Sequence, residues 1–281
     1  MKLPAFDYVA PASLSEALAA LRNNEDAKVL SGGQSLMPML AFRLLAPKLL
    51  VDLRHIGGLS DILIDGMGVH LGARVRWCDI LEDDRLATAQ PLLRAAIGHV
   101  AHYQIRNRGT VGGSLAHADP AAELPAIAVA CDAVVEIAAA SGTRRVPARD
   151  FFTGPMSTGL AEDEIIFALH FPPWPEGRRW GFREFSRRSG DFALAGIGLF
   201  FDMADRRNAN SHIAVFGVGD AAARLPEAEA ALDGAVLDVA AIAARTAEVS
   251  GDIHASAAYR RALIETMTER ALADALARRD H

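Results

Sequence analysis

The stretch of sequence that decides the fold runs from Gln104 to Pro125 and reads QIRNRGTVGGSLAHADPAAELP. Its centre is a pair of adjacent glycines, Gly112 and Gly113, between the hydroxyl residues Thr110 and Ser114. Adjacent glycines let a backbone approach a ligand closely and adopt positive φ without a Cβ penalty. The N–H groups of such a turn can surround an anion, usually a phosphate. Taken alone, the pair predicts either a phosphate-binding turn or an ordinary tight turn.

A second glycine pair lies about eighty residues earlier, in Leu30-Ser31-Gly32-Gly33-Gln34-Ser35-Leu36. A short strand at 28–30 is expected to lead into it. A helix at 35–44 is expected to follow, with Pro38 in its first turn. Two such turns in one chain predict two loops that close on one extended, phosphate-bearing ligand.

The composition excludes several classes of protein. The chain has 281 residues, of which 51% are hydrophobic, and a formal net charge of −6. This charge argues against a nucleic-acid partner. Cys78 and Cys131 form no CxxC pair, so we expect buried, reduced cysteines and no iron–sulfur cluster or metal site in this chain. With neither a signal peptide nor a long apolar run, we expect a soluble, cytoplasmic protein without a membrane span.

Hydrophobic periodicity predicts small strands that alternate with helices over the first 170 residues, which is typical of mixed α/β structure. Ser13 and Glu16 have capping-box spacing at the start of the first helix. The expected helices are 13–22, 35–44, 77–82, 91–100 and 121–130. The expected strands are 28–30, 49–53, 61–64, 69–73, 133–138 and 165–171.

A domain boundary is predicted at FPPWPEG, residues 171–177, because its three prolines can continue neither a helix nor a central strand. Beyond it the pattern changes to three expected strands at 179–186, 194–203 and 211–218. Two long expected helices follow, at 237–249 and 257–278. Strands followed by helices indicate a separate α+β domain.

Other motifs favour ordinary structure. Gly217-Val218-Gly219 matches part of a dinucleotide fingerprint, but Pro226 interrupts the helix that the fingerprint needs, and no second strand follows. His99 and His102 have one-turn helical spacing but no carboxylate or cysteine partner at a suitable spacing, so we interpret them as histidines on a helix surface. No nucleophile elbow or P-loop is present in the sequence.

Three segments together resemble one known family. In Gly32–Leu36, Gln104–Pro125 and Arg187–Ala193, the chain resembles the FAD-binding medium subunits of the molybdenum hydroxylases, the xanthine dehydrogenase and carbon monoxide dehydrogenase group. The resemblance extends from end to end. It implies a two-lobed FAD-binding domain of the vanillyl-alcohol-oxidase (PCMH) type over residues 1–174. A smaller α+β domain of the CO dehydrogenase flavoprotein type, with a three-stranded antiparallel sheet and helices, would span 178–281.

The resemblance also implies a set of FAD-binding residues. One phosphate loop would comprise Ser31, Gly32, Gly33, Gln34, Ser35 and Leu36. The other side of the pyrophosphate would be formed by Thr110, Gly112, Gly113, Ser114 and His117. Glu123 takes the place of an acidic residue that hydrogen-bonds FAD hydroxyls, and Arg183 aligns with a basic residue near the flavin ring. Leu160 or Ile165 would pack on the isoalloxazine. The chain departs from relatives at three positions. Ser31 replaces an alanine, Gln34 replaces a histidine or threonine, and His117 replaces a threonine.

The function implied by the resemblance is that of an FAD-carrying electron-transfer subunit with no catalytic acid or base of its own. A large subunit would hold the molybdopterin cofactor and hydroxylate the substrate: carbon monoxide, an N-heteroaromatic, a purine or an aldehyde. A small subunit would carry two [2Fe-2S] clusters, and the assembly would be a dimer of heterotrimers. Quinone, dioxygen or NAD would accept the electrons. The alternatives are a stand-alone FAD-dependent oxidoreductase with its own substrate pocket, and an assembly subunit that has lost its flavin.

Overall fold

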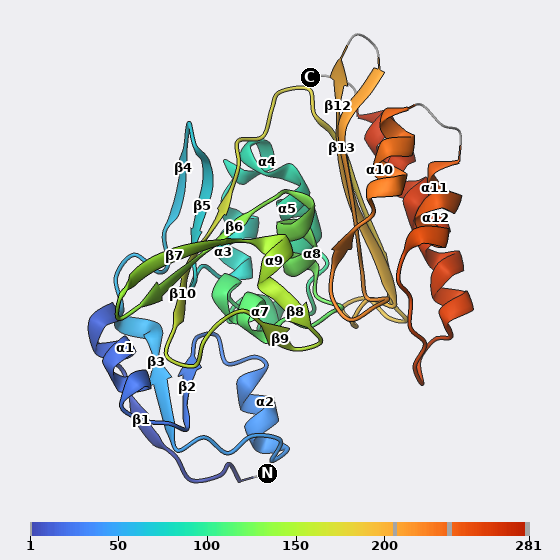
Figure 1. The fold of residues 1–281 in the computed structure, drawn as a ribbon. Helices are drawn as coiled ribbons and strands as arrows, with labels where there is room; N and C mark the ends of the chain where they lie inside the picture. The colour runs from blue at the N-terminus through green and yellow to red at the C-terminus, as the bar shows by residue number, and fades with distance from the viewer. Residues whose placement is uncertain (1, 205–206, 235–237, 279–281) are drawn as a thin grey trace.

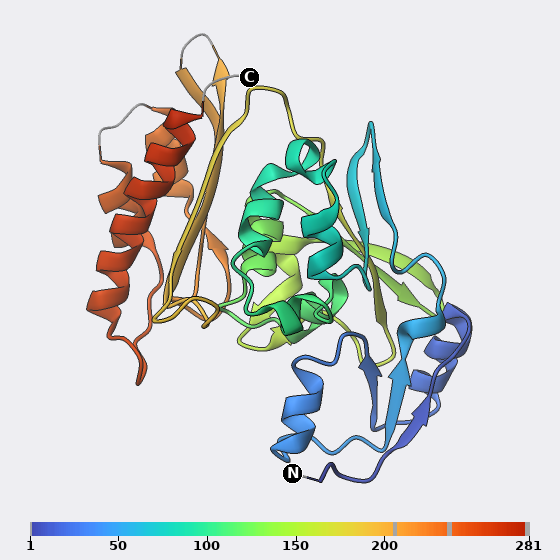
Figure 2. The ribbon, with the colours of Figure 1, turned by 180° about the vertical axis from the view of Figure 1, so that it is seen from behind.

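The structure is a computed structural model that describes residues 2–204, 207–234 and 238–278. Three larger β-sheets organise the chain (Figure 1). The first two sheets belong to two lobes of one domain, and the third belongs to the C-terminal domain. Figure 2 shows from behind that the first lobe lies at the end of the molecule away from the C-terminal helices. The predicted fold class, a two-lobed domain followed by a smaller α+β domain, is confirmed.

The first lobe contains a parallel sheet in the order β1-β3-β2. Its helix α1 begins as predicted, because the Ser13 hydroxyl accepts from the Glu16 N–H at 3.3 Å. The Glu16 carboxylate accepts from Ala12 N–H at 2.9 Å, one residue before the position that a capping box requires. The lobe comprises β1 (Asp7–Val9), α1 (Leu14–Arg22), β2 (Ala27–Leu30), α2 (Leu36–Ala41), β3 (Leu49–Asp52) and a 3-10 turn at Leu53–His55.

The second lobe contains an antiparallel sheet in the order β4-β5-β10-β6-β7, packed against a group of helices. Its strands are β4 (Ile62–Asp65), β5 (Gly68–Gly72), β6 (Val134–Ala139), β7 (Gly142–Pro147) and β10 (Ile165–Phe171), with a small hairpin of β8 (Phe152–Gly154) and β9 (Ser157–Thr158). Its helices are α3 (Trp77–Glu82), α4 (Leu86–Ala89), α5 (Pro91–Ile97), α6 (Tyr103–Arg106), α7 (Val111–His117), α8 (Glu123–Ala130) and α9 (Ala148–Phe151).

The C-terminal domain contains an antiparallel sheet between two layers of helices (Figure 1). The three predicted strands are confirmed, and the two-residue β14 pairs with β13. Phe182, Phe200 and Phe216 belong to the apolar core of the first domain, whereas the opposite face packs on α10, α11 and α12. The elements are β11 (Arg179–Phe185), β12 (Ala195–Ala204), β13 (Arg207–Phe216), β14 (Ala223–Arg224), α10 (Pro226–Asp233), α11 (Val239–Thr246) and α12 (Ala257–Ala277).

Several predicted boundaries differ from the structure. The helix expected at 35–44 ends at Ala41, because Arg43 adopts a left-handed φ of 61°. The helix expected at 91–100 ends at Ile97, and the one expected at 121–130 begins at Glu123. Residue 237, the predicted start of the penultimate helix, and residues 279–281 lie outside the described residues.

Candidate cofactor-binding cavity

A cavity of about 770 Å³ lies where the two lobes and the C-terminal domain meet. It is lined by the first glycine segment, by α7 and the start of α8, by the beginning of β10, and by Gly190, Asp191 and Phe192 from the C-terminal domain. Fourteen of the fifteen predicted site residues line it: Ser31, Gly32, Gly33, Gln34, Ser35, Leu36, Thr110, Gly112, Gly113, Ser114, His117, Glu123, Leu160 and Ile165.

The two glycine segments touch each other. A Cβ on Gly32 would lie 2.1 Å from the carbonyl oxygen of Arg108, so only glycine permits this approach of two backbones. The hydroxyls of Ser31 and Thr110 are 2.9 Å apart, within hydrogen-bond distance. The two segments, far apart in sequence, therefore lie in contact and line the same cavity, and that they hold one ligand stays a prediction.

The first glycine segment has the geometry of an anion-binding loop. Gly33 has a φ of +73°, which favours glycine. Within the described residues, the N–H groups of Gly32, Gly33, Gln34 and Ser35 donate to no other group of the protein. The Gln34 side chain folds back and donates to the Gly32 carbonyl at 3.1 Å, which fixes the loop. A run of unsatisfied N–H groups facing a cavity is suited to bind phosphate oxygens.

The second glycine segment is not the turn that the sequence predicted. Thr110 is the N-cap of α7, and Gly112 and Gly113 form its first turn. Their N–H groups are already satisfied: Val111 donates to Val75, Gly112 donates to Ala73 at 2.7 Å, and Gly113 donates to the Thr110 hydroxyl at 3.2 Å. Gly112 is needed for close packing, because its Cβ would lie 2.6 Å from that of Ala73. This segment contributes the shape of the cavity wall rather than free N–H groups.

Thr110 connects the two segments, which gives a stability prediction. We expect Thr110→Val to lower the free energy of unfolding by about 1–2 kcal/mol, because it removes the cap of α7 and the partner of Ser31. Thr110→Ser keeps the hydroxyl and is the matched control. Thermal unfolding of both variants measures the difference, and equal midpoints for the valine and serine variants would contradict this role of the hydroxyl.

Glu123 brings an acidic side chain to the wall of the cavity. It lies in the first turn of α8, as predicted. Asp119 and Pro120 lie before this helix, where the Asp119 carboxylate accepts from Ala121 N–H at 2.9 Å. Burial, and next the charge of Glu184, raise the pKa of the Glu123 carboxyl to about 8. No hydrogen bond joins this carboxyl to another side chain within the described residues. A half-buried carboxyl in the wall of a cavity is suited to accept from hydroxyl groups of a ligand.

Leu160 and Ile165 both line the cavity but are presented differently. Ile165 is 2% exposed and belongs to the core at the start of β10, whereas Leu160 is half-buried in the preceding loop. Arg144 fixes that loop: its guanidinium donates to Glu164 and to the Gly159 carbonyl. The same pairing holds the pKa of Glu164 below its usual range. Glu164 is therefore part of the support of the wall.

Arg183 does not line the cavity. It lies on the face of β11 that packs on α12, and its guanidinium pairs with Asp274 at 2.7 Å. Side chains alternate along a strand, so the neighbouring residues Phe182 and Glu184 point toward the first domain instead. The side chain of Glu184 is 6% exposed and its Oε1 is 3.5 Å from Nδ1 of His99. The expectation that Arg183 lies near the ligand is not supported by its position.

Several lining residues were not predicted from the sequence. Lys28 brings a positive charge beside the first glycine loop, and Gly190, Asp191 and Phe192 bring the C-terminal domain to the cavity. Gly190 has a φ of +88° and packs on His102, so a Cβ there would clash with the imidazole. Gly190 belongs to the segment 187–193, one of the three that carry the family resemblance. That segment was the sequence signal that could have placed Gly190 at the cavity.

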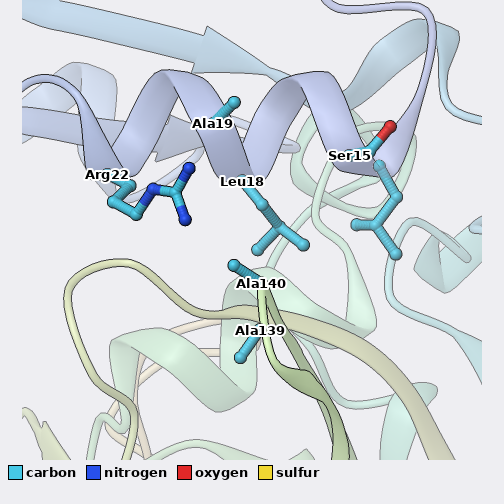
Figure 3. Close-up of a pocket in the computed structure, with 7 residues that line it drawn as sticks. Ser15, Leu18, Ala19, Arg22, Ala139 and Ala140 are labelled. Atoms are coloured by element: carbon cyan, nitrogen blue, oxygen red, sulfur yellow. The ribbon is translucent and has the colours of Figure 1, made fainter.

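The other candidate features do not form a second site of this kind. A groove of about 500 Å³ between α1 and the β6–β7 turn is lined by seven mostly small or apolar residues, with Arg22 at one end (Figure 3).

His99 and His102 do not share a helix, because the chain turns at Ala101 between α5 and α6. After Gly217 the chain forms β14, and α10 begins at Pro226, so no strand–turn–helix unit follows. Both cysteines are free; Cys131 is buried as expected, whereas Cys78 is only half-buried.

Within residues 2–204, 207–234 and 238–278, no group of three or more His, Cys, Asp or Glu residues is arranged to hold a metal ion. None of the helices in these ranges is both long and apolar enough to cross a membrane.

Comparisons with known proteins cover nearly the whole chain. The family described as the FAD binding domain in molybdopterin dehydrogenase matches residues 4–174, and the CO dehydrogenase flavoprotein C-terminal domain matches residues 180–275. The nicotine 6-hydroxylase medium subunit of Paenarthrobacter nicotinovorans is 40% identical, over 99% of this chain and 100% of its own length. The carbon monoxide dehydrogenase medium chain of Hydrogenophaga pseudoflava is 34% identical over 98% of each chain.

Solved structures show the same similarity in three dimensions. A chain of quinoline 2-oxidoreductase from Pseudomonas putida 86 superposes with a TM-score of 0.93 at 38% identity, covering 98% of both chains. A chain of carbon monoxide dehydrogenase from Hydrogenophaga pseudoflava superposes with a TM-score of 0.94 at 35% identity, covering 99% of both.

Proposed function

The chain belongs to the FAD-binding medium subunits of the molybdenum hydroxylases, and on this premise we propose that it relays electrons from the [2Fe-2S] clusters of a partner subunit to an external acceptor. The observation that carries the proposal is the cavity with unsatisfied N–H groups at Gly32–Ser35 on one side and the half-buried Glu123 on the other. One end suits a pyrophosphate and the other suits hydroxyl groups, as FAD requires. When bound, FAD supplies the redox chemistry.

The residues of the cavity would each have a part in holding FAD. The loop from Ser31 to Leu36 would bind the pyrophosphate through its N–H groups, with Lys28 adding positive charge. Thr110, Gly112, Gly113, Ser114 and His117 would form the opposite wall. Glu123 would accept from hydroxyl groups of the cofactor. Leu160 would pack on the isoalloxazine, because more of its surface than that of Ile165 is available to a ligand. Arg183 is left out of this set.

The raised pKa of Glu123 gives a prediction for FAD affinity. If the carboxylate accepts from FAD hydroxyls, binding releases its proton, and affinity should rise by up to about tenfold per pH unit as the pH increases towards 8. We expect Glu123→Gln to weaken binding and to remove this slope. Fluorescence titration of the FAD-free chain with FAD between pH 6 and 9 measures both effects.

The same carboxyl affects the stability of the FAD-free chain with the opposite sign. The folded state retains a proton that the unfolded state releases between the usual pKa of 4.5 and about 8. The free energy of unfolding should therefore fall as the pH rises through this window. Glu123→Gln should reduce that fall, and Glu176→Gln, a change at an exposed acid, should leave both pH profiles as in the wild type. A wild-type affinity that is independent of pH would exclude the proposed contact.

Electron relay is tested on the complex. We expect substrate to reduce the flavin of the complex formed by co-expressing this chain with its iron–sulfur and molybdenum partner subunits. The isolated chain should leave the same substrates unchanged. Turnover of an organic substrate by the isolated chain would instead support the stand-alone oxidoreductase.

The partners, the compartment and the domain limits are parts of the same proposal. Several relatives are named as the medium subunit or medium chain of an enzyme, and we propose a dimer of heterotrimers in the cytoplasm. Sedimentation of the co-expressed complex measures its mass. We also propose domains at 1–174 and 178–281, on either side of the proline-rich linker.

Relatives of similar identity are named for nicotine, glyceraldehyde, caffeine and carbon monoxide. We therefore propose that substrate choice lies in the large subunit.

A further inference from the structure

Two histidines face each other on the sheet of the second lobe, outside the FAD cavity. His70 of β5 and His170 of β10 are direct partners in the antiparallel register. Their Nδ1 atoms are 2.5 Å apart and their rings are arranged edge to face. Both side chains are mostly buried, at 23% and 18% exposed.

Each histidine also has a carboxylate beyond it. Nε2 of His170 is 2.9 Å from Oε2 of Glu136, and Nε2 of His70 is 3.4 Å from Oδ1 of Asp65. The Arg145 guanidinium donates to the same oxygen of Glu136, which keeps that carboxylate an acceptor. The result is a line of four groups: Asp65, His70, His170 and Glu136.

With both imidazoles neutral, this line of four groups is one proton short of a complete set of hydrogen bonds. Its three contacts need three protons, but two neutral imidazoles carry only two N–H groups, and carboxylates only accept. Every neutral arrangement therefore leaves two lone pairs facing each other. Either a third proton or a metal ion must make up the difference.

We propose that His70 and His170 form a binding site for a divalent transition-metal ion such as Zn²⁺, Ni²⁺ or Cu²⁺, held through both Nδ1 atoms. Imidazole nitrogen is a preferred ligand of these ions. Water completes the coordination, so the site needs only two protein ligands. Glu136 and Asp65 accept the Nε2–H groups and orient the rings, which is the usual outer-shell arrangement of metal-bound histidines.

Binding requires only a small rearrangement. Two nitrogens bound to one zinc ion lie roughly 3.3 Å apart, so the Nδ1 atoms must separate by about 1 Å. Asp65 lies at the exposed β4–β5 turn, where its side chain is 59% exposed, so His70 has room to shift toward it. The ion would then link β5 to β10.

Calorimetric titration of the untagged, chelator-treated chain with ZnCl₂ tests the site. We expect one Zn²⁺ per chain. His70→Asn and His170→Asn should each weaken binding by at least about 100-fold, and Glu136→Gln by about 10-fold, the effect of losing an outer-shell partner. His55→Asn, at an exposed histidine, is the matched control and should bind as the wild type does. The flavin content of each variant shows that the fold is kept.

Electron paramagnetic resonance of the wild type loaded with Cu²⁺ gives an independent measurement. Hyperfine splitting from two nitrogen ligands is expected even if the histidine variants fail to fold. The proposal is overturned if neither Zn²⁺ nor Cu²⁺ binds to the wild-type chain, as it would be if the two imidazoles instead share a third proton. Binding that survives both histidine substitutions also overturns it.

Discussion

Gly32→Val should purify without FAD and should bind added FAD at least about 100-fold more weakly than the wild type. The new Cβ would lie 2.1 Å from the Arg108 carbonyl oxygen and 3.2 Å from the Cα of Gly109, so the first glycine loop must move away from the segment before α7. Hydrogen bonds to a charged ligand contribute about 1.5–3 kcal/mol each. The loss of two of them at the pyrophosphate accounts for the expected weakening.

The matched control is Gly57→Val. Gly57 is exposed, has no left-handed φ, and a Cβ there meets nothing within 4 Å. Its flavin content should equal that of the wild type. Both variants should keep the far-ultraviolet circular dichroism of the parent chain. Normal FAD affinity in Gly32→Val would show that the ligand does not depend on contact between the two glycine segments.

Arg260→Leu should lower the free energy of unfolding by about 3–5 kcal/mol. Arg260 lies in α12, is 7% exposed, and donates to the carbonyl oxygens of Leu194 and Gly217 and to Asp252. The substitution leaves two buried carbonyl oxygens without their donor, which is costly away from water, whereas the lost pair with the half-exposed Asp252 adds little.

Arg270→Leu is the control on the same helix. Arg270 is exposed, and no hydrogen bond or ion pair of its side chain is found in the described part of the chain. Denaturant unfolding compares the two variants. Arg260→Leu should also retain FAD less firmly, because the Gly217 N–H donates to the Pro120 carbonyl three residues before Glu123. Equal stability of the two variants would contradict this role of Arg260.

Local signals predicted much of the fold. The cap and apolar face of α1 and the three long strands of the C-terminal domain depend on short-range patterns, and these elements are present. β1 and β7 were missed because their residues are largely exposed. β7 is a strand because it pairs with β6, and no pattern within its own six residues indicates that pairing.

The candidate site shows where sequence reasoning fails. Gly112 and Gly113 are in a helix, because packing of Gly112 on Ala73 outweighs the low helix propensity of glycine. Arg183 was placed near the ligand by alignment, but strand alternation turns it toward Asp274. The contact of Ser31 with Thr110 agrees with the interpretation that both segments line one site, but the sequence did not indicate this pairing of hydroxyls. Backbone conformation and side-chain direction depend on distant neighbours, and the sequence pattern alone does not specify them.

The central claim is that this chain itself holds FAD in the cavity between its lobes. The most direct test is the flavin content of the purified wild-type chain, measured from its visible absorption spectrum and from the FAD released on denaturation. The account predicts a yellow protein with close to one FAD per chain, or stoichiometric uptake when FAD is added. A folded, colourless chain that does not bind added FAD would contradict it.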